Sequence, residues 1–205
     1  MLNKKIRVGV LASTGSVGQR FVQLLADHPW FDLAVVSGSE KRVGKKYGDT
    51  CKWLLPGGIP ENVREMVMVP STPEDLDVPL VFSALPKSIA VDQEPEFAKA
   101  GIAVCTNAGA YRREKDVPVL LPEVNPDHTA LIKKQQANRG WGGFIVTNPN
   151  CTSTGTTIAL RALDKSFTLD KAFAVSLQAL SGAGCAGLPS MDSIDNVIRF
   201  ISGEE

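Results

Sequence analysis

The residue best placed to do covalent chemistry is a cysteine. Cys151 stands in the segment TNPNCTST, residues 147–154, where an apolar β-branched run gives way to a predicted helix. The first turn of a helix offers unpaired backbone N–H groups and the positive end of the helix dipole, which stabilise a thiolate and a developing oxyanion. The position therefore indicates a nucleophile. The alternative is an inert cysteine at a helix start, with Asn150 as the helix cap.

A second chemical feature is a glycine-rich turn near the N-terminus. Gly9, Gly15 and Gly18 join a predicted strand, residues 6–11, to a predicted helix, residues 15–28. Glycines allow close backbone approach to a pyrophosphate, and the helix start supplies N–H groups to it. The spacing is not a strict G-x-G-x-x-G, because position 11 is Leu, so a tight turn without a ligand is the alternative. The strand–turn–helix context favours a dinucleotide site.

The residues after the second predicted strand indicate which dinucleotide the site binds. Ser39 is followed by Glu40, Lys41 and Arg42. An NAD site usually has a carboxylate at this strand tip to hold the ribose 2′-hydroxyl, whereas small hydroxyls and cations suit a 2′-phosphate. The sequence favours NADP, although Glu40 fits that interpretation least well. A solvated charged loop is the alternative.

The order of predicted elements sets the fold class. We expect strands at 6–11, 31–37, 63–69, 80–85, 102–106 and 144–148, and helices at 15–28, 89–101 (with Pro95 as a possible break) and 126–139. This βαβ rhythm predicts an α/β fold with a doubly wound, parallel Rossmann-type sheet.

We assign residues 1–148 to an NADP-binding domain and 149–205 to the beginning of a second, α+β domain. The second region has a predicted helix at 151–166, an alternating strand at 171–180 and a helix at 190–202. One strand and two helices cannot bury a core, so we expect this domain to be truncated.

Composition excludes several classes of protein. The 205 residues carry 22 basic and 22 acidic side chains, so no strongly basic surface for nucleic acid is expected. The apolar runs are too short for a bilayer span, and the lysines and apolar run at the N-terminus lead into the glycine turn instead of a signal-peptide cleavage site. Four cysteines without a CxxC pair and two histidines give no metal-site pattern. We expect a cytoplasmic protein without nucleic-acid or membrane partners.

Six separated blocks carry a family resemblance. They are TGSVG (14–18), FSALP (82–86), NAGAYR (107–112), VPVLLPEVN (117–125), NPNC (148–151) and QALSGAG (178–184). In this order they resemble the aspartate-semialdehyde dehydrogenases of archaea and fungi, over essentially the whole chain. Cys185 and Ala186 depart from the aromatic residue and proline usual in that loop.

The resemblance implies roles for individual residues. Cys151 matches the acylated nucleophile and Gln178 the glutamine that orients the substrate at the thioester. Arg112 matches the arginine that holds the substrate phosphate, with a loop salt bridge as its alternative, and Asn150 lies beside the nucleophile. The matched cofactor-binding residues, together with the cations inferred above, are Thr14, Gly15, Ser16, Val17, Ser39, Lys41, Arg42, Ser83, Asn107, Ser181 and Gly182. A plain strand and turn is the alternative for 178–184.

The resemblance also implies that residues 149–205 begin the catalytic and dimerisation domain, and it implies the reaction. NADPH reduces L-aspartyl-4-phosphate to L-aspartate 4-semialdehyde through a cysteine thioester, in the synthesis of lysine, methionine and threonine, by a homodimer or homotetramer. The family's acid–base histidine lies beyond residue 205, and neither His28 nor His128 stands in a matching block. We therefore expect this chain alone not to turn over.

Two other functions stay open. A malonyl-CoA reductase of the same superfamily uses the same thioester and hydride steps, while the acyl-phosphate reductase of arginine synthesis fits less well because its cysteine motif differs from NPNC. A non-catalytic NADP-binding fragment is the alternative from a different class.

Overall fold

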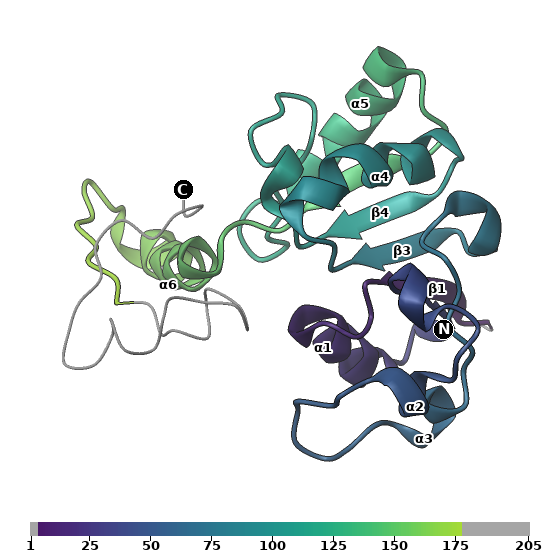
Figure 1. The fold of residues 1–205 in the computed structure, drawn as a ribbon. Coiled ribbons are helices and arrows are strands. Elements are labelled where there is room, and N and C mark those ends of the chain that lie inside the picture. The colour runs from purple at the N-terminus through teal and green to yellow at the C-terminus, as the bar shows by residue number, and fades with distance from the viewer. Residues whose placement is uncertain (1–3, 178–205) are drawn as a thin grey trace. The chain divides into compact units, whose positions relative to one another are not determined.

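The computed structural model describes residues 4–177 (Figure 1). It divides after Pro149 into two compact units, which we call unit 1 (through Pro149) and unit 2 (from Asn150). Unit 1 is built on a five-stranded parallel sheet in the order β2-β1-β3-β4-β5. The strands are β1 (Ile6–Leu11), β2 (Phe31–Val36), β3 (Leu80–Ser83), β4 (Ala103–Thr106) and β5 (Phe144–Thr147).

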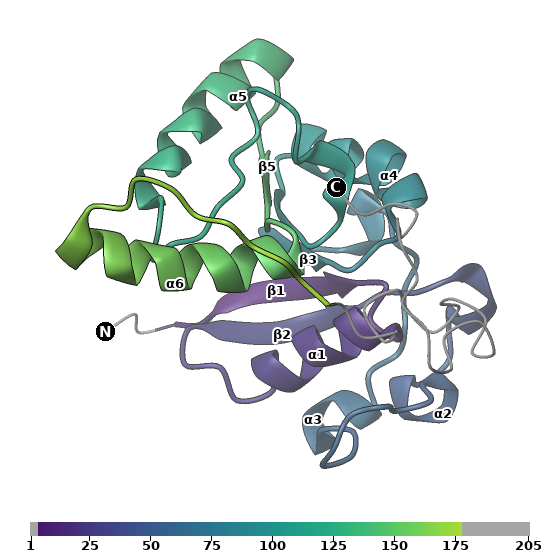
Figure 2. The same cartoon turned by 90° about the vertical axis from the view of Figure 1, so that its left-hand side faces the viewer.

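The sheet is doubly wound, as the sequence predicted. Helix α1 (Ser16–Leu25) connects β1 to β2, while α4 (Lys87–Lys99) and α5 (Leu131–Arg139) follow β3 and β4 in the other direction across the sheet (Figures 1 and 2). Because such crossovers are right-handed, reversing the direction of travel places the two sets of helices on opposite faces.

Two separate apolar clusters show that both faces are covered. Val8 and Val10 of β1 pack with Val22 and Leu25 of α1 in one cluster. The other cluster joins Phe97 of α4 to buried side chains of the neighbouring strands: Val81, Val104 and Ile145. Parallel strands buried on both faces read as continuous apolar runs, which is why five of the six strands predicted within residues 1–148 are confirmed.

The strand predicted at 63–69 is wrong. Its first residues belong to the short helix α3 (Glu61–Arg64), and only isolated bridges follow, Val67 with Lys46 and Val69 with Ser37. Val63 and Met68 are buried, so the apolar pattern reflects packing beside β2 instead of membership of the sheet. The intervening chain contains η1 (Glu40–Arg42) and α2 (Tyr47–Thr50), and η2 (Pro73–Asp75) precedes β3.

Helix α4 continues through Pro95, which the sequence marked as a possible break. A proline has no N–H, so the carbonyl of Val91, four residues earlier, loses its helical donor. The hydroxyl of Tyr111 donates to that carbonyl at 2.5 Å instead. Tyr111 closes η3 (Gly109–Tyr111), so the replacement bond also ties the segment after β4 to α4.

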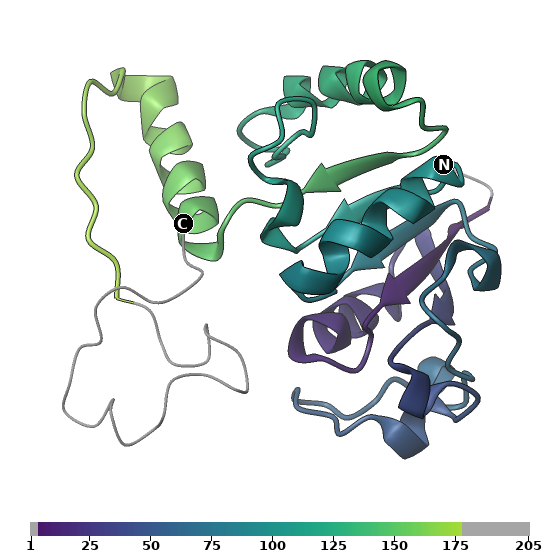
Figure 3. The same ribbon diagram turned by 45° about the horizontal axis from the view of Figure 1, so that its top comes forward.

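The predicted helix at 126–139 forms as two pieces, η4 (Pro126–Ala130) and α5. In unit 2, α6 (Cys151–Phe167) confirms the helix predicted at 151–166. The next residues run back along α6 without regular structure through residue 177, so the strand predicted at 171–180 is not found in its described part (Figure 3). The rest of that strand and the helix at 190–202 lie outside the described residues.

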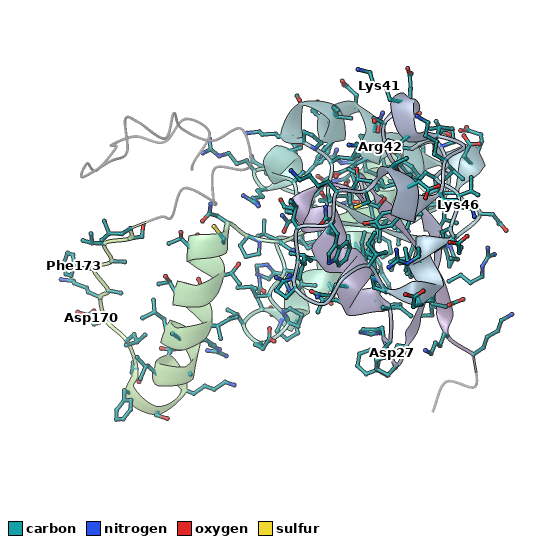
Figure 4. All side chains as sticks on the ribbon, turned by 60° about the horizontal axis from the view of Figure 1, so that its bottom comes forward. Asp27, Lys41, Arg42, Lys46, Asp170 and Phe173 are labelled. Atoms are coloured by element: carbon teal, nitrogen blue, oxygen red, sulfur yellow. The ribbon has the colours of Figure 1, made fainter. Side chains whose placement is uncertain are left out.

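No residue in the described part of unit 2 is buried. Phe167 and Phe173 are 74% and 96% exposed, and Figure 4 shows Phe173 on the segment that follows α6. The apolar side of this helix therefore has no covering layer within residues 150–177.

Candidate active site

A cleft of about 750 Å³ opens at the carboxyl ends of β1, β2 and β3. In the sheet, β1 lies between β2 and β3, and the later strands are added on the side of β1 opposite to β2. Doubly wound sheets usually bind their ligands at such a switch point. The residues that line the cleft come from four segments of unit 1, within 12–15, 38–43, 70–72 and 84–93.

The turn after β1 is shaped by Ala12, Gly15 and Gly18. Ala12 has a left-handed backbone, with φ of 53°. A Cβ on Gly18 would lie 2.3 Å from the carbonyl oxygen of Ala12, so only glycine fits where α1 crosses the turn. Gly15 is the N-cap of α1, and a Cβ there would meet nothing closer than 3.6 Å. The fold therefore requires Gly18, whereas Gly15 keeps the helix start open to a ligand.

Buried polar groups hold this turn against its neighbours. The Ser13 hydroxyl donates to the carbonyl of Ser37 at 2.9 Å, and the Tyr47 hydroxyl donates to the carbonyl of Ser13 at 2.9 Å. Gln19 donates to the carbonyl of Thr14 at 2.9 Å. Burial raises the pKa of Tyr47, so it remains a neutral donor. Sequence reasoning missed Tyr47 and Gln19, because no pattern marks a polar residue as a support for a distant turn.

The predicted cofactor residues separate into two groups. Thr14, Gly15, Ser39 and Arg42 line the cleft, together with Glu40. The other predicted cation, Lys41, does not line it; this exposed side chain lies at the outer edge of unit 1 (Figure 4). Of the two predicted cations, only Arg42 lines the cleft.

Ser16 and Val17 begin α1 beside the cleft without lining it. Ser83 is the last residue of β3, and Asn107 follows the last residue of β4. The Ser83 side chain is fully buried and its hydroxyl donates to Glu94 at 2.7 Å, so a cofactor contact through that hydroxyl has to compete with this bond. The side-chain oxygen of Asn107 accepts from Asn148 at 3.2 Å.

Arg112 is held by the main chain at the ends of two strands. Its Nε donates to the carbonyl of Asn148 at 2.8 Å, and its Nη2 donates to the carbonyl of Asn107 at 3.2 Å. Among residues 4–177 it has no carboxylate partner, so the loop salt bridge is not what holds it. Its Nη1 makes no hydrogen bond to a described residue, so both N–H groups of Nη1 and the second N–H of Nη2 remain for an anion.

A partly buried ion pair anchors the segment after Arg112. Arg139 donates to both carboxylate oxygens of Asp116, at 2.6 and 2.8 Å, and lies over the ring of Trp141 at 5.0 Å. The bonds from Arg139 hold the pKa of Asp116 below its usual value. Sequence reasoning did not single out this pair, because its members stand 23 residues apart.

Cys151 is the first residue of α6 and is exposed. The side chain of Asn150 accepts from the N–H of Thr152 at 2.9 Å, so Asn150 caps the helix; its predicted substrate contact stays a prediction. Cys51 is buried and Cys105 half-buried, and burial raises the pKa of both, that of Cys105 to about 11. Cys151 is therefore the accessible thiol among the three described cysteines, none of which is in a disulfide.

The remaining predicted residues are placed as follows. Gln178, Ser181 and Gly182 lie outside the described residues. His28 accepts from the N–H groups of Trp30 and Phe31 at 3.2 Å, and His128 shares a hydrogen bond with Asn125 at 2.8 Å. Both histidines thus have local structural partners.

Residues 4–177 contain no group of three possible metal ligands. No helix in the same part of the chain is long and apolar enough to cross a membrane.

Comparison with known proteins identifies the domain. Residues 7–132 match the family model described as "Semialdehyde dehydrogenase, NAD binding domain". The chain is 52% identical over 198 residues to aspartate-semialdehyde dehydrogenase of Archaeoglobus fulgidus, covering 97% of this chain and 57% of that protein. It is 44% identical over 206 residues to the enzyme of the same name from Cryptococcus neoformans, covering 98% and 56%.

A protein of another name is also similar. Malonyl CoA reductase (NADP) of Metallosphaera sedula is 37% identical over 203 residues, covering 98% of this chain and 57% of the relative. The chain thus spans less than two thirds of the length of these relatives.

Solved structures agree with the fold. The crystal structure of aspartate semialdehyde dehydrogenase with NADP from Candida albicans superposes with a TM-score of 0.81 at 38% identity, covering 98% of this chain and 57% of that one. The Vibrio cholerae aspartate semialdehyde dehydrogenase II, at 24% identity and a TM-score of 0.64, shows the same fold. On the match of residues 7–132, the chain belongs to the semialdehyde dehydrogenase family.

Proposed function

We propose that this chain supplies the NADP site and the thiol nucleophile for the reduction of L-aspartyl-4-phosphate to L-aspartate 4-semialdehyde and phosphate. The observation that carries the proposal is the anchoring of Arg112 to the carbonyl of Asn148, the first residue of the NPNC segment. This bond fixes an anion-binding side chain beside the chain segment that leads directly to Cys151. The two relatives named as aspartate-semialdehyde dehydrogenases support the choice of substrate.

The residues of the cleft fit NADP. Its volume of about 750 Å³ is in the range of a ligand site, and Gly15 offers backbone N–H groups at the start of α1. Arg42 provides a cation with several donors for a 2′-phosphate, and Ser39 provides a hydroxyl next to it. The Candida albicans relative was solved with NADP. When bound, NADPH supplies the hydride that reduces the acyl group.

The chain's own residues perform the steps before and around that transfer. The Cys151 sulfur attacks the acyl carbon of the substrate, a C–S bond forms, and the bond from carbon to the phosphate oxygen breaks as phosphate leaves. Arg112 binds the phosphate through the N–H donors that its two backbone bonds leave free. Backbone N–H groups in the first turn of α6 stabilise the oxyanion of the tetrahedral intermediate.

Other features of this proposal follow from the family resemblance. Gln178 orients the acyl group, Asn150 contacts the substrate, and Ser83, Asn107, Ser181 and Gly182 contact the cofactor. Residues 1–148 form the cofactor domain, 149–205 begin the catalytic and dimerisation domain, and the enzyme is a cytoplasmic homodimer or homotetramer.

An NADP-linked assay tests the proposal, using a form of the protein as long as its relatives. We expect NADPH formation from L-aspartate 4-semialdehyde that depends on both NADP and phosphate. Malonyl-CoA is the competing substrate, since one relative bears that activity in its name. If NADPH is oxidised faster with malonyl-CoA than with aspartyl phosphate, malonyl-CoA becomes the assigned substrate. Inactivity with both compounds would reject the proposed reductase function.

A further inference from the structure

Glu94 is a buried carboxyl group that no step of the proposed reaction uses. It lies on α4 and is fully buried, although charged residues are almost never fully buried unless paired. Its Oε1 accepts from the hydroxyl of Ser83 at 2.7 Å and from the hydroxyl of Thr106 at 2.5 Å. Ser83 is the last residue of β3 and Thr106 the last of β4, so one oxygen atom links the ends of two adjacent strands.

The same hydroxyls also hold the loops that follow the strands. The Ser83 oxygen accepts from the N–H of Leu85 at 3.4 Å, and the Thr106 oxygen accepts from the N–H of Ala108 at 2.9 Å. Each hydroxyl therefore accepts from its own loop and donates to Glu94. Because a hydroxyl has a single proton, donation to Glu94 fixes the direction in which its lone pairs face the loop.

Both loops carry functional surface. Leu85 lines the cofactor cleft together with Ala84 and Pro86. Asn107 lies between Thr106 and Ala108, and its carbonyl accepts from Arg112. The Glu94 carboxyl thus lies beneath one wall of the cleft and beneath one of the two anchors of the phosphate-binding arginine.

We propose that Glu94 is a positioning residue that sets the strand-end loops 84–86 and 107–108 for cofactor binding. This inference rests on the proposed NADP site.

The second carboxyl oxygen of Glu94 indicates the charge state in which the residue acts. Oε2 is buried and has no hydrogen-bond partner among the described residues. An ionised carboxylate with an unpaired buried oxygen is costly, and burial raises the pKa of Glu94, while the bonds from Thr106 and Ser83 oppose the rise. Burial and the unpaired Oε2 both favour the neutral form of Glu94, and we infer that it accepts the two hydroxyl bonds in that form. A glutamine, which has the same shape and an acceptor oxygen, should do the same work.

The test measures the NADPH dissociation constant of this chain by fluorescence titration, with thermal unfolding of each variant followed by circular dichroism. Glu94→Leu removes the acceptor and should weaken NADPH binding by roughly fivefold to tenfold, the effect of about one lost hydrogen bond. Glu94→Gln should bind within about twofold of the parent chain. Should Glu94→Leu fail to fold, Thr106→Val carries the same expectation, because it removes one hydroxyl and keeps the β-branched shape.

The matched control is Gln135→Leu. Gln135 is also fully buried, and its side chain forms hydrogen bonds with the main chain of Ile145 and Asp116. Neither of these two residues lines the cleft. The Gln135→Leu variant should therefore have a lower unfolding temperature and an unchanged NADPH affinity.

Four outcomes would overturn the inference or its neutral-acceptor part. Parent-like affinity in Glu94→Leu or Thr106→Val, or an equal loss in Gln135→Leu, would reduce Glu94 to a general stabiliser while leaving the NADP site in place. A loss in Glu94→Gln as large as in Glu94→Leu would contradict the neutral-acceptor role. Absence of NADPH binding by the parent chain would overturn the proposed cofactor site, and this inference with it.

Discussion

The Nε of Arg112 donates to the carbonyl oxygen of Asn148 at 2.8 Å. This bond joins the segment after β4 to the residue that follows β5, three positions before Cys151 in the chain. A guanidinium has five donors in a fixed plane, so bonding two backbone carbonyls on one side orients the remaining N–H groups. The residue that the resemblance assigns to phosphate binding is therefore fixed in place before any ligand arrives.

Replacing Arg112 by Lys should test that orientation. A lysine keeps the charge but cannot bond two carbonyls and a phosphate in one plane, so the KM for phosphate in the NADP-linked assay should rise by about tenfold or more. Arg113→Lys, at an exposed neighbouring position, is the control and should leave the KM unchanged. An unchanged KM in Arg112→Lys would mean that charge alone suffices there.

The two candidate cations for the 2′-phosphate should behave differently. Arg42 lines the cleft and Lys41 does not, so Arg42→Ala should lower the preference for NADPH over NADH by about tenfold, or ~1.4 kcal/mol. Lys41→Ala should change the preference far less, and the double variant should match Arg42→Ala. Dissociation constants from fluorescence titration decide the matter, and the reverse order would place Lys41 on the phosphate.

Two glycines of the first turn should separate folding from binding. Gly18→Ala would place a methyl group 2.3 Å from the Ala12 carbonyl oxygen and should destabilise unit 1 by about 1–3 kcal/mol. Gly15→Ala meets nothing within 3.6 Å and has φ of −74°, so it should leave the unfolding temperature unchanged while weakening NADPH binding. Full affinity in Gly15→Ala would show that the turn does not approach the pyrophosphate.

The pair formed by Asp116 and Arg139 should contribute pH-dependent stability. Because Arg139 lowers the pKa of Asp116 in the folded chain, the contribution is present above the unfolded pKa and is lost as pH falls through the folded value. Asp116→Asn should therefore cost about 1–3 kcal/mol at neutral pH and progressively less in acid. Urea unfolding between neutral and acid pH measures this difference. Glu65→Gln, which breaks an exposed pair with Lys46, should have no measurable effect, and a pH-independent loss in Asp116→Asn would reject the electrostatic explanation.

The sequence predicted those parts of the fold whose cause is local. Strands such as 80–83 and 144–147 are apolar on both faces because helices cover both sides of the sheet, and their runs are visible without knowledge of the partners. The segment 63–69 has a similar composition, but on the β2 side it forms only one bridge, between Val69 and Ser37, the residue that follows β2. Membership of a sheet is decided by the partner strand, which composition does not reveal.

The supporting residues were hidden for a related reason. Glu94 in the sequence resembles any acidic residue of a surface helix, and its burial follows only from the way α4 lies on β3 and β4. Pro95 is compatible with a helix because Tyr111, sixteen residues later, supplies the missing donor. The residues expected to contact ligands were found through motifs, whereas those that hold them in place depend on tertiary contacts.

The most direct test of the account is to trap the acyl group on Cys151. The protein, at the length of its relatives, is mixed with L-aspartate 4-semialdehyde and NADP without phosphate, and its cysteine peptides are mapped by mass spectrometry. Loss of hydride from the thiol adduct should leave an aspartyl thioester on Cys151, with about one NADPH formed per active site, and added phosphate should release it. Cys151→Ser should bind NADPH normally and form neither product. An adduct on Cys51, Cys105 or Cys185, or turnover by Cys151→Ser, would contradict the assignment of Cys151 as the nucleophile.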